Sequence, residues 1–258
     1  MTQPGADRYL QTLLLIRRRN ALVKKLREDP TCWELARKAN PESVFAEAVV
    51  VLCTHEPSWY CAQLEKLARK PPTVRLVALR VNEVSPGLLG HCVKLGISRL
   101  DLSGIQIYPG TLKTLVDDPA ISQLQALNLA GCALGSAGLA IILGATRATS
   151  LVELNLKRNT RQGLGSALAG CALPSLRTLD VGVNNLAFDL TQAASAKLAV
   201  TSLSARRNRL EHGSIPKLLA CPWVAQLKHL DLSGNYLNHD SVPELLATSP
   251  ALASLQSL

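Results

Sequence analysis

Apolar residues recur with a short, fixed spacing through the larger, later part of the chain. The clearest copy runs from Leu227 to Leu237 and reads LKHLDLSGNYL. Counting Leu227 as repeat position 0, leucines stand at positions 0, 3 and 5, and Asn235 stands at position 8. Positions 3 and 5 differ by two, so they lie on one face of a short β-strand.

Seven copies of this pattern follow one another at intervals of 23 to 27 residues. They begin at Val74, Ile97, Leu124, Leu151, Leu176, Val200 and Leu227. One such unit cannot bury its apolar face alone, but stacked units bury their faces together under a parallel sheet. The spacing therefore predicts an α/β repeat solenoid over residues 73–258, with a curved parallel sheet inside, helices outside, seven repeats and a partial eighth.

Position 8 is an asparagine in five copies, where the chain turns away from the strand and leaves backbone groups unpaired. A buried amide can satisfy such groups along the stack, which predicts a structural Asn ladder. The ladder residues are Asn82, Asn159, Asn184, Asn208 and Asn235. Cys132 is an acceptable variant at this position, whereas Ile105 offers no hydrogen bond and predicts an irregular second repeat.

The pattern L-x-x-L-x-L-x-x-N-x-L resembles the leucine-rich repeat over about 185 of the 258 residues. Helix-opening signals stand between the strands, namely Ser85-Pro86, Ser136, Ser214, and Ser241 with Glu244. A strand followed by a helix of about ten residues resembles the ribonuclease-inhibitor-like class, as in the Ran GTPase-activating protein and the repeat regions of NOD-like receptors. The fourth copy departs most, because Arg161 replaces the apolar residue found as Leu237 in the seventh copy.

Residues 1–72 carry no repeat and predict an all-helical N-terminal cap, since a solenoid needs an end that shields its first core layer. Helices are expected over residues 6–28, from Thr31, over residues 43–53 and from Pro57. The alternative is that the first helix projects and docks elsewhere.

Composition narrows the class of protein. With 47% hydrophobic and 3% aromatic residues, the core must be aliphatic. Seven cysteines without zinc-ligand spacing favour an intracellular, reducing compartment, so the predicted location is cytoplasmic. The basic N-terminus makes a mitochondrial location the alternative, and no apolar run is long enough to predict a membrane span.

The motifs of the common enzyme classes are absent from the sequence, including the P-loop, HExxH, GxSxG and Rossmann patterns. His229 and Asp231 share the outward face of one strand, which is usually a solvated feature. The prediction is therefore a non-enzymatic chain with no catalytic residues, cofactor, metal or small-molecule substrate.

The outward positions of the strands offer a polar concave face. Position 4 supplies Asp101, Asn128, Asn155, Asp180, Ser204 and Asp231. Positions 2, 4 and 6 contain no aromatic residue, although tight interfaces usually include aromatic or arginine anchors. This face is therefore either a modest polar site or not the main contact.

Basic residues gather where two of the strands end. This candidate basic rim comprises Lys157, Arg158, Arg161, Arg206, Arg207 and Arg209. The two groups lie two strands, or roughly 10 Å, apart. With a net charge of +9, such a rim fits an acidic protein or a nucleic-acid backbone, and the alternative is an ordinary solvated surface.

Together these features predict a protein–protein interaction module that serves as a scaffold or structural subunit of a larger assembly. The alternatives are an RNA-contacting subunit of a ribonucleoprotein, such as an organellar ribosome, and a regulator of a small GTPase. Residues 250–258 are expected to form a partial eighth strand, with Leu252 at position 0 and Leu255 at position 3. Another chain or further sequence is expected to cover that end.

Overall fold

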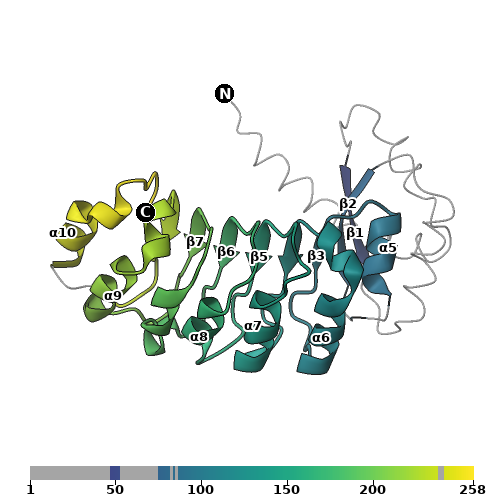
Figure 1. Cartoon of the computed structure of the whole chain (residues 1–258), viewed down its shortest axis with the longest axis horizontal. Coiled ribbons are helices and arrows are strands. Elements are labelled where there is room, and N and C mark those ends of the chain that lie inside the picture. The colour runs from purple at the N-terminus through teal and green to yellow at the C-terminus, as the bar shows by residue number, and fades with distance from the viewer. Residues whose placement is uncertain (1–46, 53–74, 82–83, 85–86, 238–240) are drawn as a thin grey trace. The chain divides into compact units, whose positions relative to one another are not determined.

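The computed structural model describes residues 47–52, 75–81, 84, 87–237 and 241–258 (Figure 1). The chain divides into two compact units, residues 1–98 and residues 99–258. The helices expected over residues 6–28, from Thr31 and from Pro57, together with Asn82 and the pair Ser85-Pro86, lie outside the described residues.

The described part of the first unit contains two parallel strands and one helix. Strand β1 (Glu47–Leu52) pairs with β2 (Arg75–Val81), and the register shifts between Ala48 and Val49. Helix α5 covers Leu88–Lys94. The helix expected over residues 43–53 is therefore wrong where β1 lies. The run Val49-Val50-Val51 explains the difference, because β-branched side chains favour strands over helices.

The second unit is built on six parallel strands of three residues each, paired in sequence order. The strands are β3 (Arg99–Asp101), β4 (Ala126–Asn128), β5 (Glu153–Asn155), β6 (Thr178–Asp180), β7 (Ser202–Ser204) and β8 (His229–Asp231). Each strand spans repeat positions 2 to 4. Equal positions pair with equal positions throughout, so Leu127 faces Leu154 and Leu154 faces Leu179.

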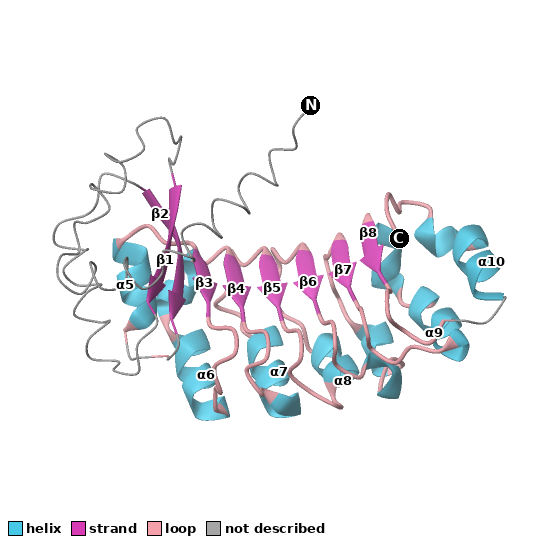
Figure 2. Cartoon of the chain, turned by 180° about the vertical axis from the view of Figure 1, so that it is seen from behind, coloured by secondary structure: helices cyan, strands magenta, loops and turns pink. Residues whose placement is uncertain are grey.

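Short helices follow the strands along the chain. They are α6 (Pro109–Asp117), α7 (Gly135–Leu143), α8 (Leu164–Ala169), α9 (Ile215–Leu219) and α10 (Ser241–Thr248). Helices α6, α7, α8 and α9 follow one another along the same side of the strands in both views (Figures 1 and 2). They have nine residues at most, fewer than the ten expected. After β6 the described chain forms 3-10 turns, η2 (Leu186–Phe188) and η3 (Gln192–Ser195), in place of an α-helix.

The core is aliphatic, as the composition requires. Position 3 lies within each of the strands β3 to β8, and position 5 follows it. Every residue at these two positions is buried; for example, Leu127 is 2% and Leu129 is 0% exposed. Burying one such leucine contributes about 2 kcal/mol of transfer free energy. Position 10 adds a third row of buried residues, namely Ile107, Leu134, Leu186 and Leu210. Arg161 interrupts this row, because it stands at position 10 of its repeat and is exposed.

Three of the turns that precede a strand share a proline-led 3-10 helix. These are η1 (Pro119–Gln123), η5 (Pro222–Gln226) and η6 (Pro250–Leu252). In each, proline occupies the first helical position, where its missing N–H costs nothing. The proline stands five residues before position 0 in the repeats of Leu124 and Leu227.

The same rule fixes the register of residues 250–258. The N–H groups of Gln256 and Ser257 both donate to the carbonyl of Lys228, and Ser257 forms a single parallel bridge with His229. Leu255 therefore occupies position 0 and Leu258 position 3. The expected register, with Leu252 at position 0, is wrong by three residues. Leu252 instead packs in the preceding 3-10 turn, 9% exposed, while Leu258 is 63% exposed.

Candidate functional site

Asparagine side chains connect successive repeats just beyond the strands. Asn184 accepts hydrogen bonds from the N–H groups of Asn159 (2.8 Å) and Thr160 (2.9 Å) in the preceding repeat. Its amide nitrogen donates to the carbonyls of Leu156 (3.1 Å) and Val181 (2.8 Å). Each side chain thus satisfies backbone groups in two repeats, and Asn184 is only 7% exposed.

Asn159, Asn208 and Asn235 bond in a closely similar way. In the third repeat the thiol of Cys132 donates to the carbonyl of Leu102 at 3.1 Å, the same type of carbonyl that the asparagines reach in the preceding repeat. Cysteine therefore supplies one of the ladder's bonds, whereas Ile105 supplies none from its side chain.

The polar residues of the predicted concave face bond to their own chain. The side-chain oxygens of Asp101, Asn128, Asn155, Asp180 and Asp231 each accept from the backbone N–H two residues later, at 2.7 to 3.1 Å. The Ser204 hydroxyl donates to Asp231 at 3.4 Å. These hydrogen bonds shape the turn that leaves each strand, and each one uses a side-chain oxygen within the molecule.

Position 2 carries the exposed residues Arg99, Thr178 and His229. Arg99 forms an ion pair with Glu153 across the small residue Ala126, which lies between them in the register. His229 lies 2.9 Å from the hydroxyl of Ser257 through Nδ1. Asp231 bonds instead to the hydroxyl of Ser204 and the N–H of Ser233.

A row of left-handed residues was not anticipated from the sequence. Every residue at position 7 of the six repeats has a positive φ: Gly104, Gly131, Arg158, Val183, Arg207 and Gly234. Glycine adopts this conformation without strain, whereas an L side chain costs about 1–2 kcal/mol. Glycine in three of the six copies was the available sequence signal.

The turns that carry this row are joined to one another by hydrogen bonds. The N–H of Arg158 donates to the carbonyl of Gly182 (3.0 Å), and that of Val183 donates to the carbonyl of Arg206 (2.7 Å). The N–H of Arg207 continues the series to Ser233 (3.0 Å). The two basic groups of the rim are therefore separated by one turn, which contributes the buried Gly182 and the half-buried Val183.

The basic rim is exposed along its length. Arg158, Arg161, Arg206, Arg207 and Arg209 are exposed and Lys157 is half-buried. Arg207 lies across the next turn. A Cβ atom added to Gly234 would lie only 2.7 Å from the Cγ atom of Arg207. Arg206 faces Asp231. Hydrogen bonding from Ser233 lowers the pKa of Asp231, and the positive charge of Arg206 adds to that effect.

An exposed aromatic side chain extends this rim from a position outside positions 2, 4 and 6. Tyr236 stands at position 9 and is 60% exposed. Its N–H donates to the carbonyl of Leu210 at 2.8 Å, and its backbone forms a parallel bridge with Glu211. Tyr236 thus lies on the turn beside that of Arg209. We call Arg206, Arg207, Arg209 and Tyr236 the arginine–tyrosine patch.

The cysteines of the second unit are free, as is Cys92 of the first unit. Burial raises the pKa of Cys92 to about 12 and that of Cys132 to about 11, which disfavours the reactive thiolate. No group of three metal-ligating side chains occurs in the described ranges. Nor does the part of the chain that the structure describes contain a helix with the length and apolarity to cross a membrane.

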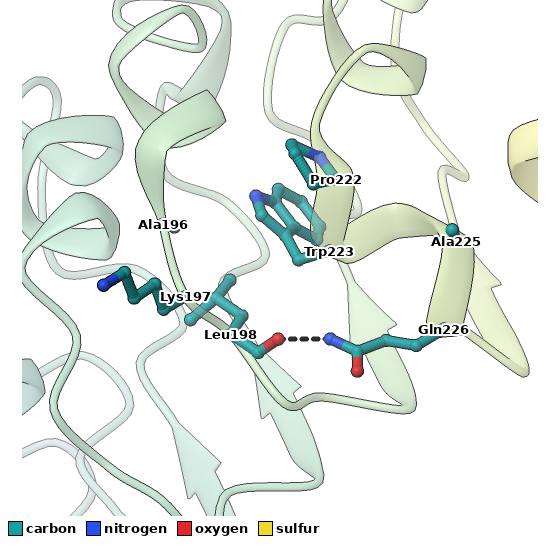
Figure 3. Close-up of a pocket in the computed structure, with 7 residues that line it drawn as sticks. All are labelled: Ala196, Lys197, Leu198, Pro222, Trp223, Ala225 and Gln226. Atoms are coloured by element: carbon teal, nitrogen blue, oxygen red, sulfur yellow. Dashed lines mark hydrogen bonds between the residues drawn. The ribbon is translucent and has the colours of Figure 1, made fainter.

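A shallow hollow of about 430 Å³ lies between the fifth and sixth repeats (Figure 3). Trp223 forms part of its wall, and the indole N–H donates to the carbonyl of Ala193 at 2.8 Å. The Gln226 amide donates to the carbonyl of Leu198. Both polar groups join neighbouring repeats, so they are used within the chain and do not form a ligand site.

A known protein family matches part of the chain. The family model of the leucine rich repeat matches residues 226–248, the segment that contains β8 and α10. No curated protein matches the chain. The match and the parallel strands with their helices support a leucine-rich repeat protein with an α/β repeat fold. Leucine-rich repeats are typically non-enzymatic modules that bind proteins.

Proposed function

We propose that this chain is a non-enzymatic protein–protein interaction module that acts as a scaffold or structural subunit of a larger intracellular assembly. The observation that carries the proposal is the basic rim. Five arginines extend from turns that hydrogen bonds hold in register, and all five are exposed. Arginine is among the residues most enriched at the energetic centres of protein interfaces.

The proposal extends to the architecture. The repeats belong to the ribonuclease-inhibitor-like class, the sheet curves as in a solenoid, and residues 1–72 form its N-terminal cap. The strand–helix units of 24 to 27 residues in the second unit favour this class. The free cysteines favour a reducing compartment, with the cytoplasm proposed over the mitochondrion.

A tagged full-length chain, expressed at native level and fractionated by size under gentle conditions, tests the assembly. It is expected to migrate well above the size of a single chain and to carry a reproducible set of partners in fixed proportion. Reversal of Lys157, Arg158, Arg206 and Arg207 to glutamate should release those partners without lowering the melting temperature of the chain. Migration as a single chain under all extraction conditions would contradict the proposal.

The same basic rim favours a second candidate, contact with RNA in a ribonucleoprotein. Binding to phosphates weakens steeply as salt rises, because counterions are released. Ribonuclease treatment of the extract separates the two functions. Partners that remain bound after treatment support the protein module, whereas partners that leave with the RNA support the ribonucleoprotein subunit.

A further inference from the structure

We infer that the arginine–tyrosine patch is the docking site for an acidic peptide segment of a partner protein. This inference rests on the proposed interaction function and names where, and with what chemistry, the partner binds. Three exposed arginines and one exposed tyrosine stand on two neighbouring turns. Arginine forks pair with carboxylates through two parallel hydrogen bonds, and tyrosine supplies a rigid amphipathic surface.

The turn itself does not require arginine at these positions. Arg207 and Arg209 have φ values of 53° and 59°, in the region where a side chain is strained. Gly234 occupies the position equivalent to Arg207 in the next repeat without that strain. Val183 shows that the left-handed conformation belongs to the turn and not to the charge. The left-handed turn therefore accepts different side chains, and two of its positions here carry exposed arginines.

Contacts with neighbouring residues place Arg207 and Tyr236. Glycine at position 234 leaves space for Arg207 to lie across the next turn. Tyr236 is fixed through its backbone to the segment Leu210–Glu211, which follows Arg209 directly. The result is a short basic surface with a single aromatic side chain at its edge.

Acidic side chains within the same area favour a peptide over RNA. Asp231 faces Arg206 from the sheet, and Glu211 is exposed beside Tyr236. An RNA backbone carries a charge at every nucleotide, so it cannot avoid these carboxylates as it crosses the patch. A peptide can place glutamates opposite the arginines and an apolar residue on Tyr236. RNA-binding surfaces also use several stacking residues in series, whereas Tyr236 is the single aromatic residue of this patch.

Fluorescence anisotropy of the full-length chain with a short, labelled, glutamate-rich peptide that contains one phenylalanine tests the inference. The double variant Arg207→Ala/Arg209→Ala should weaken binding by about tenfold or more, because two anchors are lost. It should also reduce the dependence of affinity on salt. Tyr236→Ala should weaken binding by about fivefold while leaving the salt dependence unchanged.

Two matched controls identify the site. Arg147→Ala/Lys217→Ala removes the same charge from exposed positions that do not follow a strand, and should change affinity by less than about twofold. Gly234→Ala displaces Arg207, while Gly104→Ala introduces the same backbone strain with no neighbour within 4 Å. Only the former should weaken peptide binding.

Equal loss in the Arg147/Lys217 control would overturn the inference, because binding would then reflect overall charge. A labelled single-stranded RNA that binds the same patch more tightly than the peptide would also overturn it. Absence of peptide binding at physiological salt would remove the patch as an acidic-peptide site. The proposed module would still be judged separately, by its migration with partners.

Discussion

Asn184 shows how one side chain can stabilise two repeats. Alanine at this position would leave the N–H groups of Asn159 and Thr160 and the carbonyls of Leu156 and Val181 without their partner. Buried groups left in that state cost more than the bond itself contributes. Asn184→Ala is therefore expected to lower the free energy of unfolding by about 1–3 kcal/mol in urea titrations.

The next residue provides the control. Asn185 is half-buried and makes one side-chain bond, to the carbonyl of Arg161 at an exposed site. Asn185→Ala should change the free energy of unfolding by less than about 0.5 kcal/mol. Equal effects of the two variants would contradict the structural role of the ladder.

Two glycines of the second unit should respond to alanine with opposite signs. Gly104 has a φ of 77° in the left-handed row, whereas Gly110 lies in helix α6. Neither added methyl group would meet another atom within 4 Å. Gly104→Ala should destabilise by about 1 kcal/mol through strain, and Gly110→Ala should stabilise by about 0.5 kcal/mol or more through helix propensity.

Thermal and urea unfolding of both glycine variants check this prediction. A neutral Gly104→Ala would contradict the left-handed conformation at Gly104. The comparison separates conformation from packing, because the two sites differ in φ and not in available space.

At the scale of elements, the last hydrogen bonds of the array connect β8 to the residues after η6. The N–H of Leu230 donates to the carbonyl of Ser257 at 3.1 Å. A chain that ends at Leu255 lacks this acceptor, so the Leu230 amide should exchange with solvent at least about tenfold faster. The Leu156 amide, which donates to Asp180 at 2.7 Å, serves as the internal reference and should not change.

This measurement also tests the corrected register. In the register expected from the sequence, Ser257 would lie at position 5 and would not face His229. Unchanged exchange at Leu230 in the shortened chain would therefore argue against the bridge that the structure contains.

The sequence predicted the parts of the fold that depend on a strict period. Positions 3 and 5 must be apolar in every repeat, so the leucines reveal the strands and their buried face. The register of residues 250–258 was not predictable from leucines alone, because Leu252 and Leu255 match the spacing as well as Leu255 and Leu258. Pro250 decides between them through its 3-10 turn.

Prediction was weaker for the candidate site. The basic rim could be located because charged residues at equal positions fall on neighbouring turns. The sequence-based prediction of the arginine–tyrosine patch lacked Tyr236. This residue lies beyond the strand, at a position where the other repeats carry unrelated residues. The left-handed backbone conformation of Arg207 is imposed by the turn. It could not be predicted from the conformational preferences of arginine.

For the second unit as a whole, stability is expected to depend on where a repeat lies in the array, because each repeat contacts only its neighbours. Leu154 in β5 is 2% exposed and has a repeat on either side. Leu154→Ala should lower the free energy of unfolding by about 2–5 kcal/mol.

Leu252, in η6, provides the comparison at the last repeat and is 9% exposed. Leu252→Ala should cost less than about 2 kcal/mol, because neighbouring atoms can relax into the space. In Leu252→Ala, protection from amide exchange should fall only in the last repeat. In Leu154→Ala, it should fall over several repeats. Identical exchange profiles would contradict nearest-neighbour coupling.

The direction of the ladder bonds has a consequence for how such a chain can change over generations. Each ladder asparagine of the second unit reaches back to the carbonyl at position 5 of the repeat before it, as Asn184 does to Leu156 and Asn235 does to Ala205. The bonds depend on positions that all repeats share, and not on the particular neighbours. Duplication or deletion of one whole repeat therefore preserves every connection, whereas a shift by part of a repeat breaks them. The fold accepts changes of length in units of one repeat.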